Sequence, residues 1–149
     1  MKISSYIFFI SFFFINVLSA NENIYYLILK NNEVNVRYGP GRDYPIKYVY
    51  NKKNLPVKII DKKENFRKII DFKKNNGWIH ASQLKKGKSF ILLKDQILFS
   101  SPTKYSKPLL KIAKGRLLLV KKCKAKWCKV KTKKYTGWLE AKNVWGSIN

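Results

Sequence analysis

The sequence predicts an all-β protein that consists of two copies of one small β-barrel after an N-terminal signal peptide. Short apolar runs alternate with turn residues, and no stretch of ten or more residues carries a helical stripe. The 149-residue chain also repeats one pattern, first over 34–79 and again over 97–139. Gly-Trp-apolar recurs 60 positions apart, at Gly77 and Gly137. Such a period indicates a duplicated domain.

Residues 1–20 are predicted to be a secretory signal peptide. Lys2 supplies the positive flank, Tyr6 to Leu18 is almost wholly apolar, and Ser19-Ala20 offers small residues for cleavage. An uncleaved membrane anchor is the alternative, but the apolar run is shorter than the roughly 20 residues that span a bilayer. We therefore expect an exported, periplasmic protein with no transmembrane span after signal cleavage.

The first domain is predicted at 21–86. Val34 and Val36 alternate with polar residues, as in a half-buried strand, and the loop Tyr38-Gly39-Pro40-Gly41 follows, with glycines that supply turns. Asn75-Asn76-Gly77 is typical of a tight hairpin, because Asn and Gly tolerate positive φ. Further strands are predicted at 24–29, 55–59, 66–72 and 78–80.

The second domain is predicted at 90–146, after a basic, turn-rich junction at 85–89. A polar loop at 100–108 stands where the first copy has its Gly-Pro-Gly loop. A domain of about 60 residues buries little surface on its own, so we expect the two copies to pack together. Strands are predicted at 90–93, 97–99, 117–120, 127–130 and 138–139.

Cys123 and Cys128 are predicted to form a structural disulfide. They bracket four residues between two predicted strands, and a tight hairpin brings paired Cα atoms to roughly 4.5–5.5 Å. Export favours the persistence of such a bond. A zinc site needs about four ligands, while His80 is the only histidine, and a redox pair favours two intervening residues. The sequence therefore predicts no metal site and no cofactor.

The run from Val34 to Gly41, VNVRYGPG, resembles the V-N-[VL]-R-x-G-P-G opening of bacterial SH3-like (SH3b) domains. The segments 55–59, 65–69 and 77–80 are similar to the rest of that pattern. The second copy, without the Gly-Pro-Gly loop, is similar to a degenerate partner repeat of the same family. The resemblance implies two tandem SH3-like β-barrels in the cell envelope, often linked with cell-wall peptides, and no catalytic residues.

The formal net charge of +24 attracts anions in general, including nucleic acid, lipid phosphates and carboxylate-rich polymers. Of the 32 basic residues, 28 are Lys, which also fits an organism whose proteins use Lys as the usual surface residue. Phosphate-binding sites usually rely on Arg for its bidentate fork. Basic and aromatic residues interleave as in single-strand binders, but the signal peptide argues against a nucleic-acid partner.

Tyr38 and Tyr44 flank the Gly-Pro-Gly loop and are the predicted ligand-binding aromatics, because SH3-like barrels can hold an extended peptide in a groove between loops. Arg37 and Arg42 lie beside them and could pair with a carboxylate. Solvated loop charges are the alternative for both arginines.

The tryptophans that follow Gly77 and Gly137 are expected to pack in the core. No enzyme is predicted, because a Cys–His nucleophile would need a cysteine that the disulfide consumes, and the carboxylates are too dispersed for an acid–base pair. The hypothesis is a non-enzymatic exported module that binds cell-envelope peptide or peptidoglycan. The alternative is a structural or adaptor subunit that docks on an envelope protein. The sequence assigns no oligomeric state.

Overall fold

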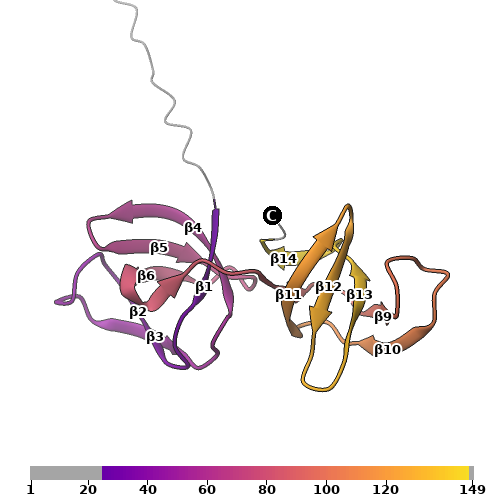
Figure 1. Cartoon of the computed structure of the whole chain (residues 1–149). Coiled ribbons are helices and arrows are strands. Elements are labelled where there is room, and N and C mark those ends of the chain that lie inside the picture. The colour runs from indigo at the N-terminus through magenta and orange to yellow at the C-terminus, as the bar shows by residue number, and fades with distance from the viewer. Residues whose placement is uncertain (1–24, 148–149) are drawn as a thin grey trace, which may run out of the picture.

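The computed structural model describes residues 25–147, and the predicted signal peptide at 1–20 lies outside that range. Within the described part, fourteen strands and one 3-10 turn form two seven-stranded antiparallel sheets side by side (Figure 1). The predicted all-β class is thereby confirmed, and the arrangement is consistent with two tandem SH3-like domains. We call the two sheets the first copy and the second copy.

The first copy has the strand order β3-β2-β6-β5-β4-β1-β7, and the 3-10 turn Ala81–Gln83 precedes its last strand. The second copy has the order β10-β9-β13-β12-β11-β8-β14, which is the same order with seven added to each strand number. The bounds in the first copy are β1 Tyr25–Leu29, β2 Val34–Arg37, β3 Ile46–Tyr50, β4 Pro56–Lys63, β5 Phe66–Ile70, β6 Asn76–His80 and β7 Leu84–Lys85. Those in the second are β8 Ser89–Leu92, β9 Gln96–Phe99, β10 Pro108–Ile112, β11 Leu117–Lys124, β12 Trp127–Lys131, β13 Thr136–Glu140 and β14 Val144–Gly146.

The register of the strands repeats as well as their order. The β4–β5 pairing slips between Ile59 and Asp61, and the β11–β12 pairing slips between Val120 and Lys122. Such irregularities bend a strand and increase its twist. Both copies therefore bend their longest strand at the same place, as two products of one duplication should.

The repeated Gly-Trp motif has a packing cause, and the predicted role of Gly77 in the hairpin turn is wrong. Gly77 lies inside β6, and the left-handed residue of the preceding turn is Lys74, with φ of 65°. A Cβ at Gly77 would strike the side chain of Val36, and one at Gly137 would lie 2.7 Å from the carbonyl oxygen of Phe99. Glycine is required at both positions because strand β2 or β9 passes too close for any side chain.

The turn before β6 is built instead by the buried carboxylate of Asp71. Its Oδ1 accepts hydrogen bonds from the backbone N–H groups of Lys73 (2.8 Å) and Asn75 (2.9 Å). Its Oδ2 accepts from the Asn75 amide (3.0 Å) and from the hydroxyl of Tyr50 (2.9 Å). An Asp side chain that bonds to the backbone a few residues on is a common way to form a turn.

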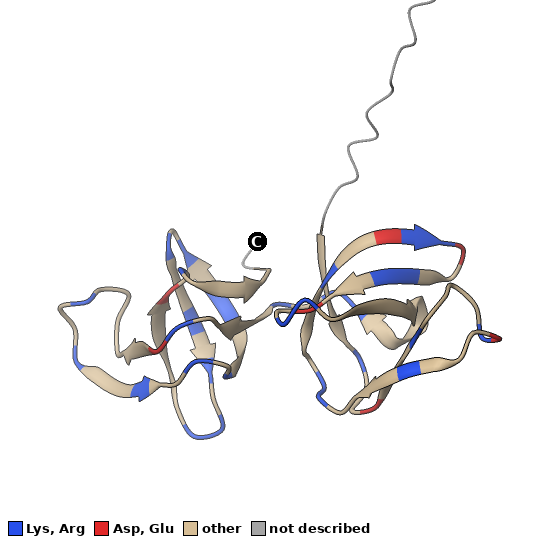
Figure 2. Ribbon diagram, turned by 180° about the vertical axis from the view of Figure 1, so that it is seen from behind, with Lys and Arg blue, Asp and Glu red and all other residues tan. Residues whose placement is uncertain are grey.

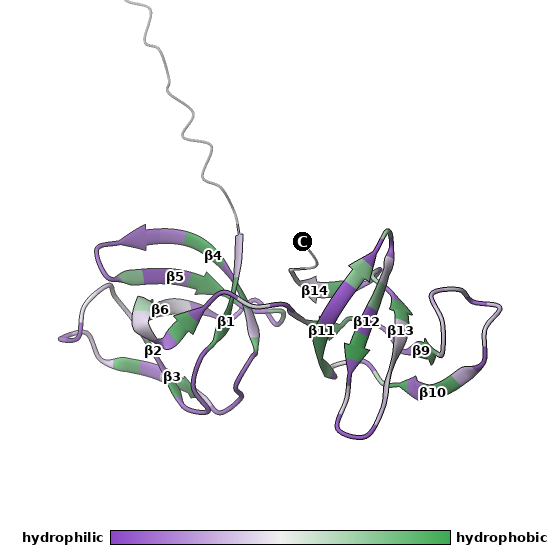
Figure 3. Cartoon of the chain, viewed as in Figure 1, coloured by the Kyte–Doolittle hydropathy of each residue, from purple (hydrophilic) through white to green (hydrophobic). Residues whose placement is uncertain are grey.

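Apolar side chains form one core in each copy, and the green segments of Figure 3 follow the strands that build them. The first core contains Leu29, Val34, Val36, Leu55, Val57, Ile59, Ile69, Ile79, Leu84 and Ile91. The second contains Phe90, Leu92, Leu98, Ile112, Leu118, Cys128, Val130 and Leu139. Of the two repeated tryptophans, Trp138 is buried as expected, whereas Trp78 is only half-buried.

Strand β8 joins the two cores, because all four of its residues are buried. Phe90 and Leu92 belong to the second core, while Ile91 points the other way and belongs to the first. The hydroxyl of Ser89 donates a 2.7 Å hydrogen bond to the carbonyl oxygen of Asn54 in the first copy. The copies therefore pack directly against each other, as the small size of each predicts.

Candidate functional site

The β2–β3 loop of the first copy, residues 38–45, carries most of the predicted ligand-binding residues, and its ends are tied together. The backbone N–H of Tyr38 donates to the carbonyl oxygen of Pro45 (3.2 Å). At the end of β2, the Arg37 guanidinium donates a 2.7 Å hydrogen bond to the carbonyl oxygen of Tyr44. Arg37 therefore braces the loop through its side chain.

Tyr44 covers the backbone of the Gly-Pro-Gly segment. A Cβ at Gly39 would strike the Tyr44 ring, and a Cβ at Gly41 would lie 3.1 Å from the same ring. The ring nevertheless stays 44% exposed. The two glycines are therefore needed so that the aromatic ring can lie flat against the loop, which gives the loop a small packed centre of its own.

Tyr38 and Arg42 are the more available members of the predicted set. The side chain of Tyr38 is 63% exposed, and the Lys47 ammonium lies 5.6 Å from its ring centroid, within cation–π range. Arg42 is exposed and makes no ion pair with any residue in 25–147. The loop thus presents one aromatic face beside a Lys and, elsewhere on the loop, an unpaired Arg.

Among the four predicted residues, the structure joins Arg37 to Tyr44, whereas Tyr38 lies beside Lys47, a residue outside the predicted set. Sequence reasoning missed Lys47, which lies on β3 and also donates to the carbonyl oxygen of Asn76 (3.0 Å). No sequence pattern indicated Lys47, because it lies near the start of β3, a largely exposed strand that the sequence did not predict. Ligand binding by these residues stays a prediction.

The equivalent loop of the second copy, residues 100–107, is closed by a different set of bonds. The hydroxyl of Ser106 donates to the carbonyl oxygens of Ser101 (3.1 Å) and Thr103 (2.9 Å). Tyr105 is 86% exposed, and the Lys104 ammonium lies 5.3 Å from its ring centroid. An exposed Tyr beside a Lys is therefore common to both loops, whereas the glycines and the arginines belong to the first alone.

Cys123 and Cys128 form the predicted disulfide across the β11–β12 hairpin, with their Cα atoms 4.0 Å apart. They are direct cross-strand partners, and the first copy has Lys62 opposite Arg67 at the equivalent position of β4 and β5. Because each sulfur is bonded to the other, neither thiol is free to act as a nucleophile.

His80 serves the backbone of the first copy. Its Nδ1 lies 2.7 Å from the hydroxyl of Ser82 and accepts from the Ser82 backbone N–H, so it caps the 3-10 turn. Asp71 uses other partners, so the two residues do not form a catalytic pair. In residues 25–147 no three His, Cys, Asp or Glu side chains cluster as metal ligands would. The same range contains no helix of the length and apolarity that a membrane crossing requires.

Positive charge is less balanced in the second copy, where residues 90–146 contain 15 basic and 2 acidic side chains, than in the first, where residues 25–86 contain 15 and 5 (Figure 2). Both acids of the second copy are already paired. Asp95 binds Lys111 (3.1 Å), and Glu140 binds Lys126 (3.1 Å) and Lys142 (2.6 Å). The remaining cations of this copy have no carboxylate within it to neutralise them.

These ion pairs change the acidity of both carboxyl groups. The backbone N–H of Lys114 and then the Lys111 ammonium lower the pKa of Asp95, and Lys142 with Lys126 lowers the pKa of Glu140. Both groups are therefore charged at neutral pH.

Comparison with known proteins identifies the family to which this chain belongs. The family model described as "Bacterial SH3 domain" matches this chain twice, at residues 30–86 and 94–146. No protein with a curated description matches it.

Three solved structures are similar to this chain over part of their length. NlpC2 from Trichomonas vaginalis is 11% identical with a TM-score of 0.38, over 83% of this chain and 48% of that one. NlpC1 from the same organism is 12% identical with a TM-score of 0.39, over 87% and 48%. An NlpC/P60 family protein from Bacillus cereus is 12% identical with a TM-score of 0.38, over 80% and 55%.

The chain therefore spans about half the length of these structures. Each family match falls on one sheet and begins just after the first strand of that sheet, β1 or β8, and the two matches together cover most of the chain. The chain belongs to the bacterial SH3 domain family, of which it carries two tandem copies.

Proposed function

We propose that this chain is a non-enzymatic, exported binding module that holds a carboxylate-bearing peptide of the cell envelope, such as the peptide stems of peptidoglycan, at the β2–β3 loop of its first copy. The observation that carries the proposal is the exposed ring of Tyr38, with Lys47 against its face, on a loop that also presents the unpaired Arg42. Bacterial SH3 domains are binding modules, which is compatible with a non-enzymatic role.

The loop suits this task because it is ordered before any ligand arrives. The hydrogen bond from Arg37 and the ring of Tyr44 fix its backbone, so binding costs little loop-ordering entropy. A guanidinium such as that of Arg42 can pair with a carboxylate through two parallel hydrogen bonds. The apolar face of Tyr38 then supplies contact area with few rotatable bonds.

The net charge acts at longer range than the loop. A chain of charge +24 is drawn to an anionic matrix, but that attraction is screened beyond about 8 Å at physiological ionic strength. Salt therefore separates the two contributions. Binding by general attraction disappears as salt rises, whereas binding that needs the loop keeps its dependence on particular side chains.

A sacculus co-sedimentation series across increasing salt tests the proposal. The chain is expected to pellet at moderate salt, with Tyr38→Ala and Arg42→Ala each lowering the bound fraction several-fold. Tyr105→Ala and Lys104→Ala are the matched controls, because they remove an exposed Tyr and a cation from the equivalent loop of the second copy. Failure to pellet at low salt, or equal losses in all four variants, contradicts the proposal.

A structural or adaptor role is the second candidate, and one feature favours it. Strand β3 lies at the end of the first sheet with one edge unpaired, and its Ile46 (46%) and Val49 (38%) are exposed. Such an edge can accept a strand from a partner protein. This candidate predicts a stoichiometric cross-link from β3 to one envelope protein, and the absence of any such product removes it.

A further inference from the structure

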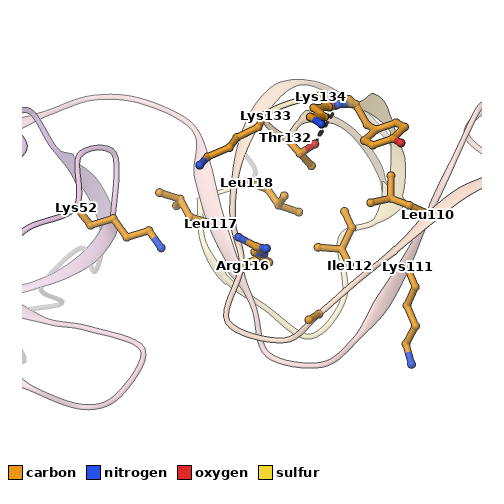
Figure 4. A pocket seen from close by; sticks show the side chains of 12 residues that line it. Lys52, Leu110, Lys111, Ile112, Arg116, Leu117, Leu118, Thr132, Lys133 and Lys134 are labelled. Atoms are coloured by element: carbon orange, nitrogen blue, oxygen red, sulfur yellow. Dashed lines mark hydrogen bonds between the residues drawn. The ribbon is translucent and has the colours of Figure 1, made fainter.

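A cavity of about 530 Å³ opens in the second copy, away from the loop on which the proposed function depends. Strand β10, the start of β11 and the β12–β13 turn surround it, and Lys52 of the first copy approaches it from the other side (Figure 4). The cavity is therefore built from both copies, which strand β8 holds together.

The inner surface of this cavity is apolar. Figure 4 shows Leu110, Ile112 and Leu118 around the hollow, with Leu117 at the side nearest the first copy. Ile112 and Leu118 belong to the second core and are only 4% and 1% exposed, so the accessible aliphatic surface comes from the half-buried Leu110 and Leu117. Tyr135 adds an aromatic ring from the β12–β13 turn and is 48% exposed. Exposed apolar surface that is rimmed by polar residues marks an interaction site more often than an ordinary surface.

Every charged side chain that lines the cavity is cationic. Lys52, Arg116, Lys133 and Lys134 line the cavity, and none of them forms an ion pair within residues 25–147. Lys111 also lines it and binds Asp95, but no carboxylate lines the cavity itself. Unneutralised like charges repel each other, so an anion seated among them gains attraction from several cations at once.

A second hollow of about 390 Å³ continues this surface. It shares Leu117, Thr132 and Lys133 with the first and adds Lys121 and Lys131. Leu119, which is 38% exposed, supplies its apolar side. The two hollows therefore form one continuous surface along β11, lined by leucines and surrounded by lysines. We call this surface the basic cleft.

We infer that the basic cleft binds the phosphate headgroup of an anionic lipid, with the first part of an acyl chain on the leucines beneath. A hydrophilic polyanion would use the rim and leave the apolar floor in water, whereas an acyl chain covers it. Arg116 can bind phosphate oxygens through its planar fork, and the Lys ammonium groups around it add point charges. Clusters of basic residues at a surface are a common way to recognise anionic lipids.

Vesicle co-sedimentation tests this inference, with the chain from residue 21 onward so that the apolar N-terminal run cannot itself insert. Binding is expected to vesicles that contain phosphatidylglycerol and not to pure phosphatidylcholine. The double variant Lys133→Glu/Lys134→Glu should lower the partition coefficient by about tenfold or more, given the usual contribution of each basic residue at a membrane surface.

The matched control is Lys62→Glu/Lys63→Glu, which makes the same change of net charge at two adjacent exposed lysines of the first copy. The control should lower binding by less than about threefold, since a distant charge acts only through a screened field. Equal losses in the two double variants would mean attraction by the whole charge of the protein and would overturn the inference.

The apolar part of the site has its own test. Tyr135→Ser should lower partition several-fold, whereas Tyr105→Ser, at a more exposed ring outside the cleft, should not. Dihexanoyl phosphatidylglycerol below its micelle concentration should shift the NMR signals of Ile112 and Leu117. Equal shifts of these signals with inorganic phosphate or heparin would indicate a polyanion site and refute lipid binding. A Tyr135→Ser variant with an unchanged partition coefficient would refute it as well.

Lipid binding at the basic cleft and peptide binding at the β2–β3 loop can be refuted independently of each other. Tyr38→Ala and Arg42→Ala should leave vesicle binding unchanged, because both residues lie on the first copy's loop. Vesicle binding that requires them would overturn the assignment to the cleft, while loss of sacculus binding alone would leave it in place.

Discussion

The indole Nε1 of Trp145 donates a 3.3 Å hydrogen bond to the carbonyl oxygen of Pro56, 89 residues earlier in the chain. The same ring meets Tyr26 edge to face, with centroids 5.6 Å apart, and packs against the first core. The last strand of the second copy is therefore anchored in the first copy, and the two copies should unfold together.

Trp145→Ala should lower the free energy of unfolding by roughly 2 kcal/mol or more and separate one thermal transition into two. Calorimetry measures both effects. Trp127→Ala is the matched control, because Trp127 packs edge to face on Phe99 inside the second copy. It should destabilise that copy while leaving the two copies coupled, and a split transition in the control instead would contradict the assignment.

Gly77→Ala and Gly137→Ala should each cost about 1–3 kcal/mol of stability, because the new methyl group meets a neighbouring strand at both positions. Urea denaturation gives the values. Asn76→Ala, one residue earlier at an exposed position, should stay within about 0.5 kcal/mol of the wild type. A neutral Gly77→Ala variant would show that β2 can move away from β6.

Asp71→Ala should cost about 3 kcal/mol, because it leaves the Tyr50 hydroxyl and two backbone N–H groups without their buried acceptor. Glu33→Ala removes an exposed carboxylate with no ion pair and should change stability by less than about 0.5 kcal/mol. Amide exchange at Lys73 and Asn75 should quicken in the Asp71 variant alone, and unaltered exchange there would exclude the turn-building role.

Reduction of the Cys123–Cys128 bond, or the double change to serine, should destabilise the second copy by about 2 kcal/mol, the chain-entropy value for so short a loop. The equivalent pair in the first copy, Lys62 and Arg67, has no covalent link, so reductant acts on the second copy alone. Because the copies unfold together, urea denaturation with and without reductant should show the loss as one lowered midpoint. An unchanged midpoint would contradict a stabilising role for the disulfide.

Stability should fall in acid partly through Glu140, whose pKa in the folded state is lowered by Lys142 and Lys126. A lowered folded-state pKa contributes stability that is present above the unfolded value, 4.5, and is lost as pH falls through the folded value. Glu140→Gln should therefore flatten the decline of the urea midpoint below that pH. The same slope in variant and wild type would mean that these ion pairs add nothing.

The duplication and most of the buried strands could be predicted because they depend on local patterns. Val34 and Val36 alternate with polar residues, and both are fully buried. Strand β3 was not predicted, since it lies at the sheet edge and exposes Ile46 and Val49, so no buried stripe distinguishes it from a loop. The two-residue strand β7 and its equivalent β14 are too short to carry a pattern.

The candidate site was predictable in composition and not in arrangement. The Gly-Pro-Gly motif located the loop, but that Tyr44 covers the glycines and Arg37 braces them depends on three-dimensional packing. The backbone pairing also makes Pro45 equivalent to Lys107, whereas matching the similar dipeptides Pro45-Ile46 and Pro108-Leu109 in the sequence would make Pro45 equivalent to Pro108. The basic cleft escaped notice because β10, β11 and the β12–β13 turn come together only in the fold.

Because strand β8 has Ile91 in one core and Phe90 in the other, neither copy can swivel about a hinge between them. The two surfaces discussed above are thus held at one distance and one mutual orientation. Binding of a cell-wall peptide and a lipid headgroup at the same time would therefore require the two ligands to lie at one separation, which the fold sets and no flexible linker can adjust.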